Sequence, residues 1–392
     1  MKLKRIAIDT SKTVFTLHGV DEQERVVLRH DLKRHQVEPF FAGQPATEVV
    51  LEACGGSHHW ARRLTALGHT ARLIPPQYVT PFVKRGKTNS KDAEAINEAA
   101  SRPSMRFVPV KSAEQQATAM VLSVRELLVK QRTQLVNALR GHAAEFGVVA
   151  AQGTGNVERL LAKLAAEPAV PDAAQPMLAL LGEQIAHLHA RIAELDRRLA
   201  VLHKANPVSR LLAEIPGVGP IGALTLALTV DAGQFRSGRH FAAWIGLTPK
   251  EHSTGDKQRL GGISREGNER LRRLLVLGAT SVVRLAGPGA KPGGRPRRAS
   301  AKPTDAAAGR KATAAAKQTD RAGREPGDAA VATSRGKAAG KRRNPAVTPW
   351  LTELLERRPR KVAAVALANK MARIAWAMMT SGEAYRREPI AA

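Results

Sequence analysis

The chain has 392 residues, and its 62 Lys and Arg against 34 Asp and Glu give a formal charge of +28. This length allows two or three domains, and so large a positive charge is typical of a protein that binds nucleic acid. The single cysteine, Cys54, excludes an intrachain disulfide and indicates a reducing cytoplasm. No Cys/His cluster has zinc spacing. We expect no signal peptide, because "MKLKRIAIDT" has no h-region followed by a cleavage site. We also expect no membrane span, because Lys370 and Arg373 interrupt the longest apolar stretch.

Residues 1–110 predict an α/β domain. Three strand-like segments come first, separated by turn-like or charged residues: "RIAIDTSK", "TVFTLHGV" and "ERVVLRH". A helix is expected at about 31–42, and the apolar run "TEVVLEACGG" then fits a buried parallel strand. Helix-like, strand-like and helix-like segments complete the unit. Three antiparallel strands followed by alternating helix and strand is the order of a ribonuclease-H-like fold.

Residues 111–205 predict a helical region. One long helix is expected over 112–146, followed by a looser stretch to about 176. Eight apolar residues then recur three and four apart, as at the a and d positions of a coiled coil: Leu178, Leu181, Ile185, Leu188, Ile192, Leu195, Leu199 and Leu202. We predict a two-stranded coil between two chains, with Arg191 and Asp196 paired across it. The alternative is a helix packed inside its own domain.

Residues 206–286 and 347–385 predict a mainly helical C-terminal domain. The segment between them, 287–346, contains almost no large apolar residues and many Ala, Gly, Pro, Lys and Arg. It cannot bury enough surface to offset the entropy lost on ordering. We therefore expect a basic, disordered insert there.

Three carboxylates form the first candidate site. Asp9 ends the first predicted strand, Glu52 ends the fourth, and Asp92 begins a helix. The first and fourth strands of a ribonuclease-H-like sheet are neighbours, so Asp9 and Glu52 should lie close together, with Asp92 added by the helix. Hard carboxylate oxygens suit Mg²⁺, which can stabilise the attacking and leaving oxygens of a phosphodiester. Taken singly, each residue could instead be a turn or helix-capping residue.

Two further segments are suited to phosphate. Gly217 and Gly219 of "IPGVGP" permit a tight turn between two helices, whose amides can contact a DNA backbone as in a helix-hairpin-helix element. An ordinary helix–helix turn is the alternative. Ser253 lies in "LTPKEHSTGDKQRLGGISREGNERLRRLL", surrounded by four cations: Lys250, Lys257, Arg259 and Arg265. From the residues alone, this segment is equally a phosphate-contacting loop or the site of a serine nucleophile.

Six ordered motifs resemble the one-ten family of insertion-sequence transposases: "AIDTSK", "VLEACGGSHHWAR", "IPPQYVTPFVKRGKTNSKDAEAI", "IPGVGP", "FAAWIGLTPKEHSTGDKQRLGGISREGN" and "KVAAVALANKMARIAWAM". The resemblance covers nearly the whole chain outside about 287–346. It implies a RuvC-like domain with a DEDD acidic set that binds Mg²⁺, a coiled-coil region and a C-terminal transposase domain with a catalytic serine. It also implies an RNA-guided recombinase. A structured bridge RNA would pair with donor and target DNA, and the domains of different protomers would form a composite site in a dimer of dimers.

Carried onto this sequence, the resemblance makes Asp9 and Glu52 the first two acids and Ser253 the nucleophile, with Thr254 the less favoured alternative. The family commonly has two Asp residues three positions apart at the start of the "DAEAI" helix, the later one being the first residue of that motif. Asp92 matches the later one, but Asn89 stands at the earlier position. An amide oxygen is a weaker, neutral metal ligand. The metal position is therefore weakened, or Glu94 compensates, or this copy is impaired.

We therefore expect a cytoplasmic, nucleoid-associated DNA transposase that combines metal-binding carboxylates with a serine nucleophile. One alternative is a metal-dependent nuclease or resolvase in which Ser253 only holds phosphate. The other is a non-catalytic nucleic-acid-binding remnant of a mobile element.

Overall fold

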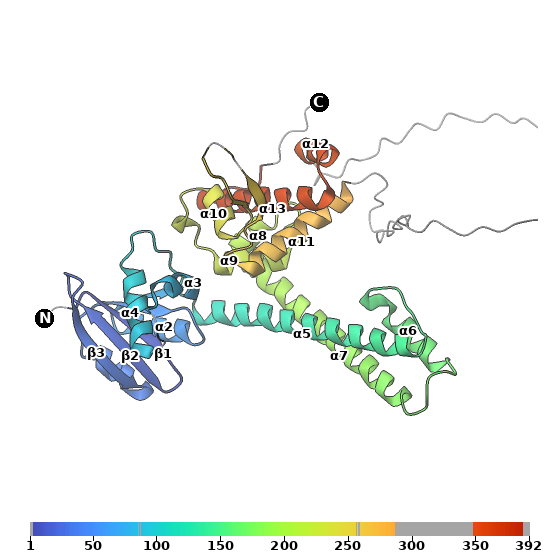
Figure 1. Ribbon diagram of the computed structural model, residues 1–392, viewed down its shortest axis with the longest axis horizontal. Helices are drawn as coiled ribbons and strands as arrows, with labels where there is room; N and C mark the ends of the chain where they lie inside the picture. The colour runs from blue at the N-terminus through green and yellow to red at the C-terminus, as the bar shows by residue number, and fades with distance from the viewer. Residues whose placement is uncertain are drawn as a thin grey trace, which may run out of the picture.

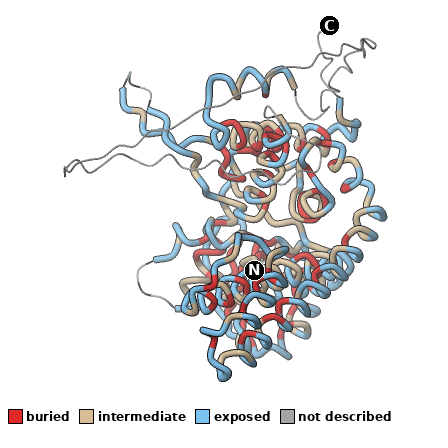
Figure 2. Tube along the Cα trace, turned by 90° about the vertical axis from the view of Figure 1, so that its right-hand side faces the viewer, coloured by how far each residue is buried: buried red, intermediate tan, exposed pale blue. Residues whose placement is uncertain are grey.

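The computed structural model describes residues 3–286 and 348–386, apart from residues 85, 87, 256 and 258. The predicted insert at 287–346 lies outside these residues. Figure 1 shows an α/β domain at one end, a two-helix arm that runs away from it, and a mainly helical C-terminal domain above the start of the arm. Buried residues gather inside the C-terminal domain and, below it in Figure 2, in the α/β domain and arm, which overlap in that view.

The α/β domain is built on a five-stranded sheet in the order β3-β2-β1-β4-β5. The first three strands form an antiparallel meander, while β4 lies parallel to β1 and β5 parallel to β4. This is the strand order predicted for the N-terminal part of the chain. The bounds are β1 Arg5–Thr10, β2 Val14–Val20, β3 Val26–Lys33, β4 Glu48–Glu52 and β5 Thr70–Ile74.

Helices cover both faces of this sheet. On one face, Ile6 and Ile8 of β1 pack with buried residues of α1 and α2. On the other, Ala7 of β1 and Val50 of β4 pack with α3 and α4. Alternate strand residues point to opposite faces, so Asp9 shares the α4 face with Ala7, and Glu52 shares it with Val50. The helices are α1 Val37–Ala42, α2 Ser57–Ala66, α3 Pro76–Val79 and α4 Asn89–Ala100.

The arm is an antiparallel pair of long helices, α5 (Ala113–Glu145) and α7 (Gln175–Ala205), with the short α6 (Val157–Ala165) packed at its far end. In α7 the predicted a positions Leu178, Ile185, Ile192 and Leu199 are buried, whereas the d leucines are half-buried. Leu178 and Ile185 pack with Val136 and Leu139 of α5, and Leu199 packs with Val121 and Leu122. Much of the seam therefore packs within one chain, as in the alternative that the sequence left open.

Arg191 and Asp196, expected to pair across a coil between two chains, each have another partner in this structure. Asp196 accepts a 2.5 Å bond from Nε of Arg125 on α5, and Arg191 pairs with Glu194 on its own helix at 3.0 Å. Self-association through the half-buried edge of α7 stays a prediction.

Five helices of the C-terminal domain pack around an apolar cluster that includes Phe241, Leu271 and Met371, and Leu351 of a sixth helix packs in a second cluster. Helix α13 has the length and hydropathy of a membrane span, but its Ala368, Met371 and Ala375 lie in the first cluster. The elements are α8 Pro207–Leu212, α9 Pro220–Thr229, α10 Gly238–Trp244, β6 Pro249–Glu251, β7 Leu260–Ile263, α11 Glu269–Leu285, α12 Pro349–Arg357 and α13 Arg360–Ser381.

Candidate active site and nucleic-acid interface

The sheet register brings Asp9 and Glu52 side by side. Ile8 of β1 is aligned with Leu51 of the parallel strand β4, so the next residues of both strands are Asp9 and Glu52, on the same face. Both carboxylates are only half-buried. Their proximity agrees with the expectation from the sequence.

Helix α4 presents its first turn to the same face. Ile96 is fully buried against the sheet, and Asp92 and Asn89 lie four and seven residues before it, on one stripe of the helix. Asp92 is half-buried and Asn89 is exposed. Oxygen ligands of this kind suit a divalent metal chemically. Among the described residues, however, no three His, Cys, Asp or Glu side chains are close enough to share one ion.

A buried polar cluster, which the sequence analysis missed, fixes α4 on the sheet. Arg5 Nε donates to Asn97 Oδ1 at 2.6 Å, and Asn97 Nδ2 donates to the His18 carbonyl at 2.8 Å. The same amide lies 3.1 Å from His18 Nδ1. Burial lowers the pKa of His18, which favours the neutral ring that can accept this bond. Asn97 is five residues beyond Asp92, so the cluster positions the acidic end of α4.

Glu94 is occupied in this structure. Its Oε1 lies 2.5 Å from Lys84 Nζ, and that hydrogen bond lowers the pKa of the carboxyl group. For Glu94 to compensate for Asn89, as the sequence suggested, the ion pair with Lys84 would first have to break.

Ser253 lies near the end of the β6–β7 hairpin. The strands pair Pro249 with Ile263, and a further bridge joins Thr254 to Lys257. Gly255 has a φ of +57°, which a side chain would disfavour in this tight turn. The Arg259 backbone amide donates to Ser253 Oγ at 3.1 Å, so the hydroxyl is oriented by an N–H group.

The four cations predicted around Ser253 lie on the hairpin or just beyond it. Lys250, Lys257 and Arg259 are exposed on the hairpin, and Arg265 is exposed just beyond it. Although His252 adjoins Ser253 in sequence, no hydrogen bond joins its ring to the hydroxyl among the described residues. The arrangement offers positive charge and a presented hydroxyl, without a histidine base beside it.

The foot of the hairpin is held by close backbone contacts. A Cβ on Gly267 would lie 1.8 Å from the Trp244 carbonyl oxygen, and one on Gly246 would lie 2.1 Å from that of Glu266. Arg272 Nη1 donates to the carbonyl oxygens of Ile245 and Glu266, both at 2.8 Å. These contacts fix the base of the Ser253 hairpin on the domain.

The glycines of "IPGVGP" lie in the turn between α8 and α9. Gly217 has a φ of +92°, and its backbone touches that of Gly278 on α11 so closely that a Cβ on Gly278 would lie 2.0 Å from the Gly217 oxygen. Gly219 is the exposed N-cap of α9, which has no side-chain cap. Gly217 thus has a structural role. Pro220 follows Gly219 and has no N–H group, so the first amides that α9 can offer to an anion are those of Ile221 and Gly222.

The carboxylates and Ser253 belong to different domains. Figure 1 shows the yellow-orange hairpin near α10, on the C-terminal domain and apart from the blue α/β domain. Within one chain, the structure does not bring the predicted acidic and serine residues together.

Two family models match the chain. One, described as "Transposase IS116/IS110/IS902 family", matches residues 209–292, and the other, described as "Transposase" and named for the DEDD domain of IS110, matches residues 6–147. These ranges contain Ser253 and the acidic residues respectively.

Three relatives align over 98% of this chain. The "Putative transposase y4pF/y4sB" of Sinorhizobium fredii is 48% identical and is covered over 86% of its length. The "Probable family 20 transposase" of Pseudomonas aeruginosa is 44% identical and is covered over 99%. The "Transposase for insertion sequence element IS1111A" of Coxiella burnetii is 35% identical and is covered over 92%. With this fold and these matches, the chain belongs to the IS110/IS116/IS902 family of transposases and is an enzyme of DNA transposition.

Proposed function

We propose that this transposase cuts and rejoins DNA with two chemical parts, an acidic face for a divalent metal and Ser253 as a covalent nucleophile. The observation that supports the proposal is the register of β1 and β4, which carries Asp9 and Glu52 onto the sheet face that α4 covers. A basic hairpin that presents a hydroxyl supplies the second part.

The metal would be held by Asp9, Glu52 and Asp92, with Asn89 as a neutral ligand. Mg²⁺ bound there would stabilise negative charge on the oxygens of the scissile phosphate. Because the described side chains are not gathered into one metal site, we expect α4 or Glu52 to shift when metal and DNA bind.

Ser253 carries the covalent step. Its Oγ forms a bond to the scissile phosphorus, the bond from phosphorus to the leaving DNA oxygen breaks, and the serine proton passes through solvent to that oxygen. Attack by another DNA hydroxyl on the phosphoserine ester rejoins the strand and frees Ser253. Lys250, Lys257, Arg259 and Arg265 would bind phosphate oxygens during both steps. Gly217 and Gly219 would offer backbone contacts to DNA farther along.

Sequence choice would come from a guide RNA. The resemblance supports a structured RNA that pairs with donor and target DNA, and the charge of +28 suits a protein that binds both kinds of nucleic acid. The acidic face and Ser253 lie in different domains, so we infer a composite site shared between protomers of a dimer or dimer of dimers. The enzyme would work in the bacterial cytoplasm, at the nucleoid.

The test combines purified protein, the element's RNA, Mg²⁺ and labelled donor and target DNA. We expect a denaturant-resistant protein–DNA adduct that is lost in Ser253→Ala and in Asp9→Ala and kept in Thr254→Ala. Cleavage without an adduct would identify a metal-dependent nuclease with Ser253 as a phosphate clamp. Nucleic-acid binding with neither cleavage nor adduct would identify a non-catalytic remnant.

A further inference from the structure

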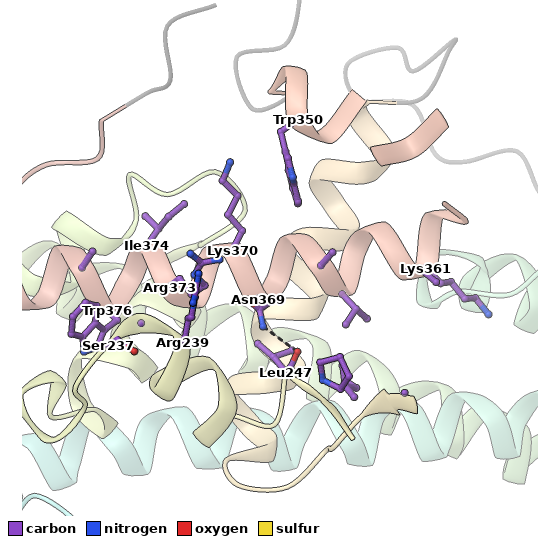
Figure 3. Close-up of a pocket in the computed structure, with 18 of the residues that line it drawn as sticks. Ser237, Arg239, Leu247, Trp350, Lys361, Asn369, Lys370, Arg373, Ile374 and Trp376 are labelled. Carbon is purple, nitrogen blue, oxygen red and sulfur yellow. Dashed lines mark hydrogen bonds between the residues drawn. The ribbon is translucent and has the colours of Figure 1, made fainter. Parts of the chain in front are cut away.

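A groove of about 1360 Å³ lies on the C-terminal domain beside the Ser253 hairpin. Figure 3 shows its residues coming from α10, from one side of α13 and from Trp350 of α12. Pro249, Gly261 and Ile263 of the hairpin form part of the wall. No residue assigned to the chemistry above lines this groove.

The groove is positively charged. No Asp or Glu lines it, whereas four cations do: Arg239, Lys361, Lys370 and Arg373. The side chains of Arg239 and Arg373 overlap in the view of Figure 3, and a Cβ on the adjacent Gly238 would lie 3.1 Å from Arg373 Cα. Among the described residues, Arg239, Lys361 and Arg373 form no ion pair with a carboxylate. Guanidinium and ammonium groups left without a protein counter-charge fit a polyanion.

The groove is also aromatic and apolar. The Trp350 ring lies 4.8 Å from Lys370 Nζ, and Trp376 is fixed by a 3.1 Å hydrogen bond from Nε1 to the Ala232 carbonyl. Val362 is 51% exposed. A DNA duplex presents phosphates outward and hides the faces of its bases, so it would leave this wall in water. An unpaired strand offers both phosphates and base faces, and cationic grooves with aromatic side chains bind such strands.

The groove lies within reach of Ser253 along the chain. Ser253 is four residues beyond Pro249 in the hairpin, a span of at most about 14 Å for extended chain. A strand held in the groove can therefore extend to the Ser253 hydroxyl.

We propose that this groove binds the unpaired DNA strand that adjoins the scissile phosphate, with a base stacked on Trp350 and phosphates on Arg239, Lys361 and Arg373. The proposal rests on the function of Ser253 inferred above. It adds the form of the substrate, single-stranded DNA, and the residues that select it over duplex.

The test is fluorescence anisotropy of the full chain with a labelled 12-nucleotide DNA strand and with the matching duplex, in EDTA and at several salt concentrations. Trp350→Leu should weaken single-strand binding by about 5- to 150-fold, the range measured for removing one base–aromatic stack, and leave duplex binding unchanged. Trp350→Phe, which keeps a ring, should bind nearly as well as the wild type.

The cations are tested in the same assay. Arg239→Gln with Lys361→Gln should weaken single-strand binding at least tenfold. The slope of log affinity against log salt concentration should become shallower by about 1.4, as expected for two lost phosphate contacts. The control is Arg197→Gln with Arg198→Gln, an equal loss of charge on exposed α7 positions, which should change affinity less than twofold. Equal effects of the two pairs would reduce the groove to general positive charge and overturn the proposal.

Other outcomes also decide it. If Trp350→Leu left single-strand binding unchanged, or if Trp350→Phe weakened it as much as Trp350→Leu, no base would stack on residue 350. Tighter binding of an RNA strand of the same sequence would reassign the groove to RNA. Ser253→Ala should keep single-strand binding while losing the adduct, so the two proposals fail separately. If the wild type formed no adduct but the groove variants still lost binding, only the proposed nucleophile would be wrong.

Discussion

Asn89 is the residue at which this chain departs from an all-carboxylate acidic set. It is the first residue of α4, after the N-cap Thr88, and it shares a helix stripe with Asp92. Only an amide oxygen is available at this corner of the acidic face. In the proposed function, this side chain would govern how strongly the acidic face holds a divalent metal ion.

Asn89→Asp should strengthen divalent metal binding. A carboxylate in the first turn also stabilises the helix by about 0.3–1 kcal/mol without metal, because it interacts with the free amides. Ser90→Asp is the matched control, since it gives the same helix effect from the next position, off the stripe. We expect Mg²⁺ to raise the melting temperature of Asn89→Asp more than that of Ser90→Asp. An equal response to Mg²⁺ would place residue 89 outside the metal site.

His58 should make the stability of the α/β domain depend on pH. Burial, assisted by Lys111 and Arg62, lowers its pKa to about 4, and its Nδ1 accepts from the Lys111 amide at 3.2 Å. The unfolded chain, with a pKa near 6.5, binds a proton that the folded chain rejects. The free energy of unfolding therefore falls as the pH drops from about 6.5 toward 4.

His58→Gln keeps a hydrogen-bond acceptor but cannot titrate. Urea unfolding at pH 7.5 and at pH 4.5 should show a loss of stability that is smaller in the variant, by about 2 kcal/mol after allowance for partial solvent exposure. Identical losses in both proteins would mean that His58 is protonated in the fold.

At the level of elements, the contact between the α8–α9 turn and α11 depends on two glycines. Gly278→Ala should destabilise the C-terminal domain by about 1–3 kcal/mol, because its Cβ would fall 2.0 Å from the Gly217 oxygen. Gly222→Ala in α9 is the control, since its Cβ would meet only Val218 at 3.7 Å. The control should gain the ordinary helix propensity of alanine, about 0.5–1 kcal/mol, in chemical unfolding. Stabilisation by both substitutions would show that the turn can move aside.

The two edges of α7 should respond differently to substitution. Ile185→Ala or Ile192→Ala removes a side chain buried in the arm and should cost about 2–5 kcal/mol of stability. Leu188→Lys with Leu195→Lys changes half-buried d positions, and we expect it to weaken self-association while the fold persists. Sedimentation and thermal unfolding of both sets measure this. Unchanged mass in the lysine variant would place the dimer contact elsewhere.

The sequence predicted the order of the sheet well, because strand periodicity and turn residues are local signals. It placed Asp9 beside Glu52 for the same reason. It could not reveal the Arg5–Asn97–His18 cluster, because Asn97 is 92 positions from Arg5 and 79 from His18. No local sequence pattern marks such a buried polar network. The heptads of α7 were visible, but a heptad pattern is the same whether its partner is α5 or another chain.

For the whole molecule, the separation of the two domains predicts complementation between chains. Mixed Asp9→Ala and Ser253→Ala proteins should regain an adduct, because one chain supplies intact carboxylates and the other an intact serine. If the two variants are made with different chain lengths, a denaturing gel separates them. The DNA should then be attached only to the Asp9→Ala chain, which keeps Ser253. Absence of any adduct in the mixture, with the wild type active, would mean that each site forms within one chain.

The two helices of the arm are matched in length. Helix α5 has 33 residues and α7 has 31, so each is about 50 Å long, and they lie against each other along their buried residues. Inserting seven residues into α5 alone would slide its far half by about 10 Å past α7 and break every contact beyond that point. Natural or engineered change in the arm's length must therefore occur in both helices at matching depths.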